Sequence, residues 1–338
     1  MITGFGFFLF PFSPGCNRKE HAPLPVDIVD DEKKKLAIED AARISKGFEA
    51  AYLKLHGSGE LKKRGEDLWQ IMEDCRLCPR ECGAHRIKGE KGFCRSTSQL
   101  EISAFHPHFG EESCLVGRGG SGTIFMTNCG LRCVFCINWE ISQGGSGSAR
   151  SIEEMAGMMI HLQKIGCHNI NVVTPTHYSP HIVLALDIAA EKGLRLPLVY
   201  NTCGWERLEI LKKLDGIVDI YLPDFKYSDG AMASRYSSAA NDYPEITQAA
   251  LLEMNRQVGV AHPANDGLLS RGLIIRHLVM PNNVSGTEQV MKWIGKNLPK
   301  DTYVNVMSQY RPMYKAHEYP DIARRITRKE YEDAIRWA

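Results

Sequence analysis

The chain has 338 residues, of which 43% are hydrophobic and 24% are charged, and its formal net charge is +1. This balance is ordinary for a globular protein, and no broad basic field predicts binding to nucleic acid. No run approaches the roughly 18 apolar residues that a membrane span needs, so we expect no membrane partner.

The first residues of the chain are apolar, and a charged region follows them. Residues 2–15 end at Cys16, but no Lys or Arg precedes them and prolines interrupt them. We therefore interpret them as a disordered or misassigned start rather than as an export signal. Residues 30–55 show helical spacing of apolar side chains, and a Gly-Ser-Gly break at 57–59 ends the pattern. We expect residues 1–70 to form a tail and an accessory helical arm.

Cysteine is the strongest compositional signal. The chain has eleven cysteines, an odd number, and seven of them fall in two tight clusters. Disulfide frameworks usually belong to short secreted chains, whereas short Cys-to-Cys spacings in a chain of enzyme size are typical of metal ligation. A centre held by thiolates implies a reducing compartment, so we expect a cytoplasmic protein.

The first cluster lies in residues 71–120, together with a linker that is rich in His and Gly. Its spacing is C-x2-C-x3-C-x11-C, and its members are Cys75, Cys78, Cys82 and Cys94. Four thiolates suit a closed site, and zinc or an auxiliary iron–sulfur cluster both fit. A small module with little core of its own would be held together by such a metal. Four unligated thiols in a surface loop are the alternative.

From residue 121 onward, short β-rich runs alternate with helical patterns. The runs are nearly continuous in apolar residues, as in strands buried on both faces, and lie at 121–127, 169–175, 197–203, 218–225, 273–280 and 302–309. Helical patterns lie at 151–165, 180–192, 205–214, 243–259 and 285–297. Alternation of this kind predicts right-handed βαβ units around a parallel sheet. Six units are too few for a closed eight-stranded barrel. We predict an α/β fold with a partial (β/α)6 TIM-like barrel at 121–316 and a C-terminal helix in 317–338.

The second cysteine cluster follows the first predicted strand directly. Cys129, Cys133 and Cys136 form a C-x3-C-x2-C pattern at the end of the strand where barrels of this type bind ligands. Three thiolates hold three irons of a cubane cluster and leave the fourth iron open to another ligand. A zinc site is the alternative, but it needs a fourth ligand and no His lies in this stretch.

This pattern resembles the radical S-adenosylmethionine superfamily, in particular the branch of pyruvate formate-lyase-activating enzymes and their uncharacterised homologues. The resemblance covers residues 70–316. It implies a [4Fe-4S] cluster, S-adenosyl-L-methionine as cofactor, and an oxidoreductase that removes a substrate hydrogen through a 5′-deoxyadenosyl radical. An activating enzyme of this branch would need an external electron donor of the flavodoxin or ferredoxin type and would act on a partner protein. The alternatives are an oxidoreductase or maturase acting on a peptide or small molecule, and a non-enzymatic iron–sulfur carrier.

Two strand ends carry motifs that resemble those of the activating branch. Asn201, Thr202 and Cys203, followed by Gly and Trp, resemble its D-T-N-G motif, whose Asp helps to hold a monovalent cation near the cofactor carboxylate. The neutral Asn201 departs from that motif. Asp224 and Lys226 resemble its D-x-K motif and, with Cys203 as a candidate hydrogen-atom relay, are the candidate catalytic residues. The structural alternatives are a turn that closes a strand and a salt bridge at the rim.

Two further strands supply candidate cofactor contacts. Arg276 is a charge on an otherwise apolar strand, and it resembles the Arg of the activating branch that contacts S-adenosylmethionine. His277 is its neighbour in the pleat, so we expect it to face the other way. Gln309 and Tyr310 end the last strand, where that branch places an adenine or substrate contact.

The largest departure from the superfamily lies at the end of the second strand. Many members carry a G-G-E motif there that binds the cofactor amino group, whereas this chain has Thr174-Pro-Thr176-His177. Thr174 or Thr176 would have to supply oxygens in its place. We interpret His177 as a surface residue, because isolated loop histidines usually are.

Overall fold

The computed structural model describes residues 48–338. The predictions for the apolar start, for Cys16 and for most of the helical arm therefore lie outside the described residues. No helix within 48–338 has both the length and the apolar character that crossing a bilayer requires.

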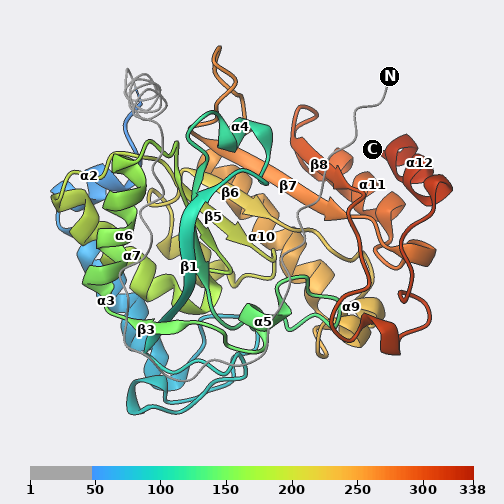
Figure 1. Ribbon diagram of the computed structural model, residues 1–338, viewed down its shortest axis with the longest axis horizontal. Coiled ribbons are helices and arrows are strands. Elements are labelled where there is room, and N and C mark those ends of the chain that lie inside the picture. Colours follow the sequence, from blue (N-terminus) through green and yellow to red (C-terminus); the bar gives the residue numbers. More distant parts are fainter. Residues whose placement is uncertain (1–47) are drawn as a thin grey trace, which may run out of the picture.

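An eight-stranded sheet forms the centre of the molecule, in the order β3-β1-β2-β4-β5-β6-β7-β8. The strands are β1 (Leu100–His108), β2 (Ser121–Met126), β3 (Ser148–Arg150), β4 (Ile170–Val173), β5 (Leu198–Thr202), β6 (Ile220–Pro223), β7 (Gly272–Leu278) and β8 (Tyr303–Met307). β2 and β4 to β8 are parallel neighbours, whereas β1 pairs antiparallel with β2 and β3. The sheet does not close on itself, which confirms the predicted partial barrel (Figure 1).

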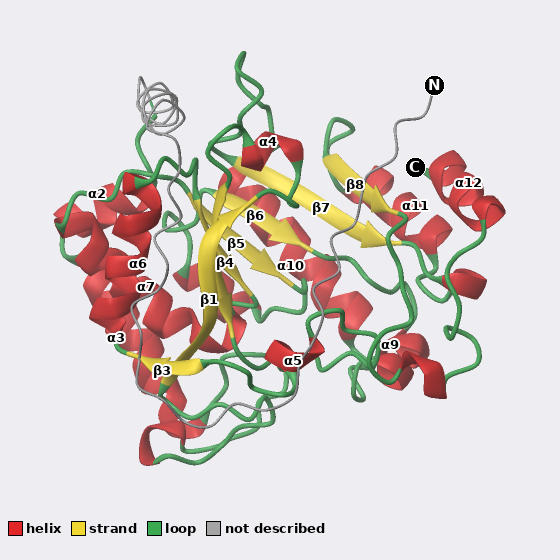
Figure 2. Cartoon of the chain, in the orientation of Figure 1, coloured by secondary structure: helices red, strands yellow, loops and turns green. Residues whose placement is uncertain are grey.

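Helices lie along the outside of the sheet (Figure 2). They are α2 (Tyr52–Gly57), α3 (Glu60–Gln70), α4 (Ser113–Val116), α5 (Trp139–Ser142), α6 (Ile152–Lys164), α7 (Ser179–Glu191), α8 (Leu208–Lys213), α9 (Gly230–Tyr236), α10 (Tyr243–Val258), α11 (Thr287–Asn297) and α12 (Arg328–Trp337). Capping boxes begin α6 and α12, where the side chains of Ser151 and Thr327 accept hydrogen bonds from the third residue of each helix.

The helices at the start of the described chain pack directly on the barrel. Gly59 separates α2 from α3 with a φ of 77°, at the predicted Gly-Ser-Gly break. Tyr52 is fully buried, and its hydroxyl donates a hydrogen bond to the carbonyl of Leu196 at 2.9 Å. At Gly65 a Cβ would lie 2.7 Å from the side chain of Leu184 on α7, so α3 and α7 touch closely. Residues 48–70 are thus part of the outer helical layer.

Two strands, β1 and β3, and three short helices, α4, α5 and α9, were not predicted. β1 has no regular alternation of apolar side chains, and Pro107 lies within it. β3 falls in the Gly- and Ser-rich stretch at 142–149, which the sequence suggests is a flexible loop; that interpretation is wrong for its last residues. β3 forms because β1 offers it backbone partners, with Leu100 opposite Arg150. Short edge strands of this kind depend on the neighbouring strand more than on their own sequence.

Alternation of side chains across the sheet creates two cores. The larger core lies between the sheet and the helices. The smaller one fills the barrel interior near α4 and consists of Cys114, Leu115, Val199, Ile220, Leu222, Ala261, Leu269 and Ile274. Because α4 and α5 lie at opposite ends of the strands, this core closes the amino end of the barrel and leaves polar groups near the carboxyl end (Figure 1).

Candidate functional site

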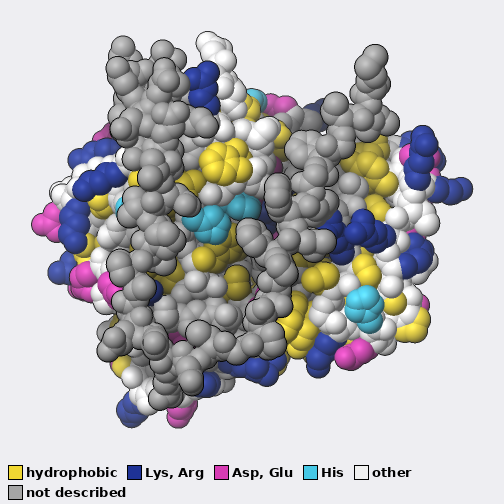
Figure 3. All heavy atoms as spheres, in the orientation of Figure 1, with side chains coloured by type: hydrophobic (Ala, Val, Ile, Leu, Met, Phe, Trp, Pro, Cys, Tyr) yellow, Lys and Arg dark blue, Asp and Glu magenta, His cyan; other side chains and the backbone are white. Residues whose placement is uncertain are grey.

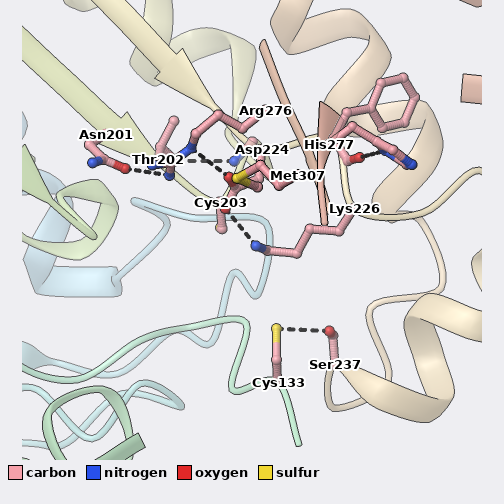
Figure 4. Close-up of polar contacts among 12 residues, drawn as sticks. Cys133, Asn201, Thr202, Cys203, Asp224, Lys226, Ser237, Arg276, His277 and Met307 are labelled. Atoms are coloured by element: carbon pink, nitrogen blue, oxygen red, sulfur yellow. Dashed lines mark hydrogen bonds and ion pairs between the residues drawn. The ribbon is translucent and has the colours of Figure 1, made fainter. Parts of the chain in front are cut away.

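Three cysteines lie on the loop that follows β2, at the carboxyl end of the parallel strands. Cys133 is buried, Cys129 and Cys136 are half-buried, and all three are free thiols. The hydroxyl of Ser237 donates to Cys133 Sγ at 3.0 Å (Figure 4), and Ser142 Oγ lies 3.2 Å from Cys136 Sγ. Two of the three sulfur atoms are therefore held by neighbouring hydroxyl groups.

The backbone of this loop is held in an unusual conformation. Asn128 and Arg132 have φ values of 68° and 50°, in the left-handed region. The side chain of Asn128 donates to Glu101 at 3.1 Å, and that of Gln143 donates to the carbonyl of Cys133 at 2.7 Å. These bonds hold the loop in a tight coil.

The environment of the thiols suits metal ligation. Burial raises the pKa of Cys133 to about 12, with Lys226 opposing the effect, and burial also raises the pKa of Cys129. Buried thiols of this kind stay neutral until a metal deprotonates them by coordination. Three thiols on one loop, with no fourth cysteine beside them, fit a cluster that keeps one iron free of protein ligands.

A buried network of charges lies at the ends of β6 and β7. Asp224 Oδ2 is 2.5 Å from Lys226 Nζ, and its Oδ1 is 2.9 Å from Arg276 Nε (Figure 4). All three side chains are at most 16% exposed. Burial alone would raise the pKa of Asp224, but Arg276 and Lys226 outweigh it and hold the pKa below its usual value. Asp224 and Lys226 do form the salt bridge considered as an alternative, but it is buried rather than exposed at the rim.

Asn201 joins this network from β5. Its Oδ1 accepts a hydrogen bond from Arg276 Nη2 at 2.7 Å, and its Nδ2 donates to Glu111 Oε1 at 3.3 Å. Arg276 Nη1 also lies 3.4 Å from Glu111 Oε2. The structure thus brings together Asn201 and Arg276, which were both predicted to contact the cofactor. It also adds Glu111, which the sequence analysis missed. Its position next to another Glu in the linker before β2 was the available signal.

Thr176 and Thr202 meet at another carboxylate, on the other face of β5 from Asn201. Thr176 Oγ1 donates to Glu206 Oε1 at 2.6 Å, and Thr202 Oγ1 donates to the same oxygen. Glu206 is 1% exposed, and burial raises its pKa to about 7 against the effect of the two hydroxyl groups. The side chains of these threonines therefore contact Glu206 rather than Arg276. Glu206 was missed, although an acidic residue so soon after a strand end was a usable signal.

Thr174 and Cys203 lie at the ends of β4 and β5. The φ of Thr174 is 59°, a value that β-branched residues rarely adopt and that glycine adopts freely, and its N–H donates to the carbonyl of Asn201 at 2.9 Å. The threonine thus keeps a glycine-like backbone where the superfamily has G-G-E. Burial raises the pKa of Cys203, and the charges of Cys129 and Lys226 are near enough to affect it.

The two residues predicted after β8 lie apart from Arg276. Gln309 is exposed, and its amide lies 3.4 Å from Met307 Sδ. Tyr310 is buried, its hydroxyl donates to the carbonyl of Ile322 at 2.7 Å, and its ring centre is 5.9 Å from that of Phe135. Tyr310 therefore packs against the cysteine loop with its hydroxyl already bonded.

The two histidines of the predicted strand ends have structural partners. His177 is buried rather than on the surface as predicted, and its Nε2 lies 2.8 Å from the carbonyl of Thr127. The short helical turn after β4 places it beneath the cysteine loop. His277 faces away from the ion-pair network, as predicted, with its ring nitrogens near Phe225 and Thr287.

The first cysteine cluster forms a compact module around a buried arginine. Arg86 is fully buried, and it bonds two backbone carbonyls and lies 3.7 Å from the sulfur of Cys75. Three of its four cysteines are buried, namely Cys75, Cys78 and Cys94, and Cys82 is exposed. Within residues 48–338, no three His, Cys, Asp or Glu side chains are grouped as ligands of one metal ion.

Arg80 connects this module to the cysteine loop. Its guanidinium donates to the carbonyls of Gly130 and Ser237, each at 3.0 Å. The same group lies 4.2 Å from the ring centre of Phe93 and 4.7 Å from that of Trp205. Because Gly130 lies between Cys129 and Cys133 in sequence, the two cysteine groups are neighbours in space.

Comparisons with known proteins agree with this arrangement. Residues 123–236, which include the cysteine loop and β2 to β6, match the Radical SAM superfamily. An uncharacterised protein of Methanocaldococcus jannaschii is 36% identical over 278 residues, which cover 79% of this chain and 75% of that protein. An open barrel with three free cysteines after its first parallel strand is consistent with both matches. The chain belongs to the radical SAM superfamily.

Proposed function

We propose that this protein cleaves S-adenosylmethionine reductively with a [4Fe-4S] cluster held by Cys129, Cys133 and Cys136, and that it thereby abstracts hydrogen from a substrate. The observation that carries the proposal is the placement of three free thiols on one loop beside the buried Asp224–Lys226–Arg276 network. When bound, the cluster supplies one electron to the cofactor and offers it an iron without a protein ligand.

The residues of the chain position the reactants and exclude water. Arg276 offers a planar guanidinium for the cofactor carboxylate, since its Nη atoms extend beyond Asp224 to Asn201. Asp224 forms an ion pair with both Arg276 and Lys226, so the two side chains keep their positions when the cofactor leaves. Cys203 remains a candidate hydrogen-atom relay. Thr174, Thr176, Thr202, Gln309 and Tyr310 stay predicted cofactor contacts, and Thr176 and Thr202 would act through Glu206.

The substrate of this chemistry has two candidate classes. An activating enzyme for a partner protein's glycine is the first, supported by the resemblance of Asp224 and Lys226 to the D-x-K motif of that branch. An oxidoreductase or maturase acting on a peptide or small molecule is the second.

A second metal centre is proposed at Cys75, Cys78, Cys82 and Cys94. Its support is Arg86, a fully buried cation whose described partners are two carbonyls and the sulfur of Cys75. A buried charge needs a counter-charge, and metal-bound thiolates would supply one. Zinc or an iron–sulfur cluster would both do so. We further propose that an external donor of the flavodoxin or ferredoxin type reduces the protein in the cytoplasm.

The test is anaerobic reconstitution with iron and sulfide, followed by dithionite and S-adenosylmethionine. We expect 5′-deoxyadenosine by mass spectrometry from the native chain and none from the variant in which Cys129, Cys133 and Cys136 are all Ala. A variant with Cys75→Ser and Cys78→Ser serves as the matched control. It should lose iron or zinc from the module, as measured by elemental analysis, and still form the product. Product from the triple variant would contradict the proposal, and no product from a well-formed cluster would favour an iron–sulfur carrier.

A further inference from the structure

The segment between β1 and α4 inserts two consecutive carboxylates into the barrel. The side chain of Glu111 is 10% exposed, and Glu112 is 9% exposed. Glu111 contacts Arg276 and Asn201, and the amide of Asn305 donates to Glu112 Oε1 at 3.0 Å. Because these partners belong to β7, β5 and β8, both carboxylates lie in the interior next to the ion-pair network.

The charges that face this space do not balance. Among the described residues, two cations meet three carboxyl groups: Lys226 and Arg276 against Asp224, Glu111 and Glu112. Burial raises the pKa of Glu111 to about 7, Arg276 opposes the effect and Glu112 adds to it. Below about pH 7, a proton on Glu111 therefore takes the place of a third cation.

Two oxygen acceptors in the same interior are unsatisfied. Within the described chain, Glu112 Oε2 and Asn171 Oδ1 are buried and have no hydrogen-bond partner. Asn171 lies on the inner face of β4, where its amide donates to Ser121 Oγ at 3.1 Å. A buried acceptor without a partner costs about 1–3 kcal/mol, so such groups commonly await a ligand. A site whose unsatisfied groups are all acceptors suits a ligand that carries N–H donors.

An aromatic cluster lies on β1 and β2. His106 and His108 on β1 lie with their ring centres 5.5 Å and 5.9 Å from that of Phe125 on β2. The space-filling view shows histidine side chains gathered over β1 among hydrophobic ones (Figure 3). Aromatic faces attract cations, and burial together with His106 lowers the pKa of His108 and keeps it neutral.

We propose that Glu111 and Glu112 form a binding site for a protonated amine of the substrate, beside Asp224 and Arg276. The amine replaces the proton of the carboxyl pair, balances the interior charge and donates to Glu112 Oε2. Naming this guest as the substrate rests on the proposed function. The amine can belong to a small molecule or to a lysine-like side chain of a peptide, because the recognised chemistry is the same.

The experiment uses the full chain with reconstituted cluster and three probes of equal length, n-butylamine, n-butanol and butyrate, with binding followed by ligand-detected NMR. We expect butylamine alone to bind measurably, and to bind about fivefold more tightly at pH 7 than at pH 6, because each molecule displaces one proton from Glu111. The double variant E111Q/E112Q should lose at least about tenfold in affinity and the pH dependence. E209Q, at a carboxylate that is 68% exposed, is the matched control and should bind as the native chain does.

Several outcomes would overturn this inference. Equal binding of butanol or butyrate would mean that charge is not recognised, and butylamine binding retained by E111Q/E112Q would place the amine elsewhere. If the double variant does not fold, the absence of the pH effect in the native chain is still decisive. Displacement of butylamine by S-adenosylmethionine would assign the site to the cofactor's own amine instead. None of these results depends on formation of 5′-deoxyadenosine, so failure here is distinct from failure of the proposed function.

Discussion

Buried carboxyl groups with raised pKa values make the stability of this protein sensitive to pH. Glu206, Glu111 and Asp219 each have a pKa raised to about 7, with burial as the first cause. A carboxyl whose pKa is higher in the folded state binds more protons there than in the unfolded chain. Stability from this source is present below the unfolded pKa and is lost as the pH rises toward 7.

The substitution Glu206→Gln tests this account at one residue. We expect the native chain to lose stability between pH 5 and pH 8, and E206Q to lose up to about 3 kcal/mol less, since glutamine cannot ionise. The amide oxygen still accepts from Thr176 and Thr202, so the fold is kept. Urea unfolding at four pH values measures the slope, with the exposed Glu209→Gln as the control. An identical slope in E206Q and the native chain would refute the assignment.

The strained backbone of Thr174 predicts a stabilising substitution. A left-handed φ costs a β-branched residue roughly 1–2 kcal/mol, whereas glycine adopts it freely and loses about 0.5–1 kcal/mol of chain entropy. Thr174→Gly should therefore raise the free energy of unfolding by up to about 1 kcal/mol, as measured in urea. Thr302→Gly, at a threonine without a positive φ, should lower it. Destabilisation by T174G would show that the threonine side chain matters more than its backbone.

At the scale of elements, the sequence predicted those strands and helices whose signature lies within their own residues. All six runs of apolar residues became the parallel strands, because strands buried on both faces carry that signature. β1 and β3 were missed because these strands form by pairing with neighbouring strands, and their own sequences carry little strand signal. Asn201 was found through a motif at a strand end and Arg276 as a charge on an apolar strand, whereas Glu111 and Glu206 lie in loops. Their role depends on which strands the loops meet, and no local pattern encodes that.

The contact between the cysteine module and the cysteine loop is the element-scale feature with the clearest test. Arg80→Ala removes two hydrogen bonds to carbonyls and the contacts with Phe93 and Trp205, so we expect a loss of about 2 kcal/mol in unfolding free energy. Because Gly130 lies within the cysteine loop, the electron paramagnetic resonance spectrum of the reduced cluster should shift as well.

Arg76→Ala is the matched control for that variant. Arg76 is 58% exposed and pairs with Asp74 at the surface of the same module. Its removal should change stability by less than about 1 kcal/mol and leave the spectrum as in the native chain. If the spectrum of R80A is identical to that of the native chain, the cysteine module does not influence the environment of the cluster.

At the scale of the whole molecule, the site is assembled from nearly the full length of the described chain. The cysteine loop or its neighbours are reached by Lys226 from the end of β6, by Ser237 from the end of α9 and by Arg276 from β7, all more than 80 residues further along. The order of strands in an open barrel determines these meetings. Short motifs in the sequence were enough to predict the fold. They did not reveal that Glu111 and Glu112 lie next to the ion-pair network, because that depends on the order of the strands.

The last strand of an open sheet has a free edge, and α12 covers part of it. The hydroxyl of Tyr331 donates to the carbonyl of Val306 at 3.4 Å, while the carbonyl of the next residue, Met307, bonds toward β7. Unpaired strand edges template aggregation. A chain that ends at residue 326 should therefore fold its barrel but self-associate, which light scattering would detect as concentration-dependent growth. If the shortened chain self-associates, the carboxyl-terminal helix keeps the protein in solution, and affinity tags or fusions are better kept away from it.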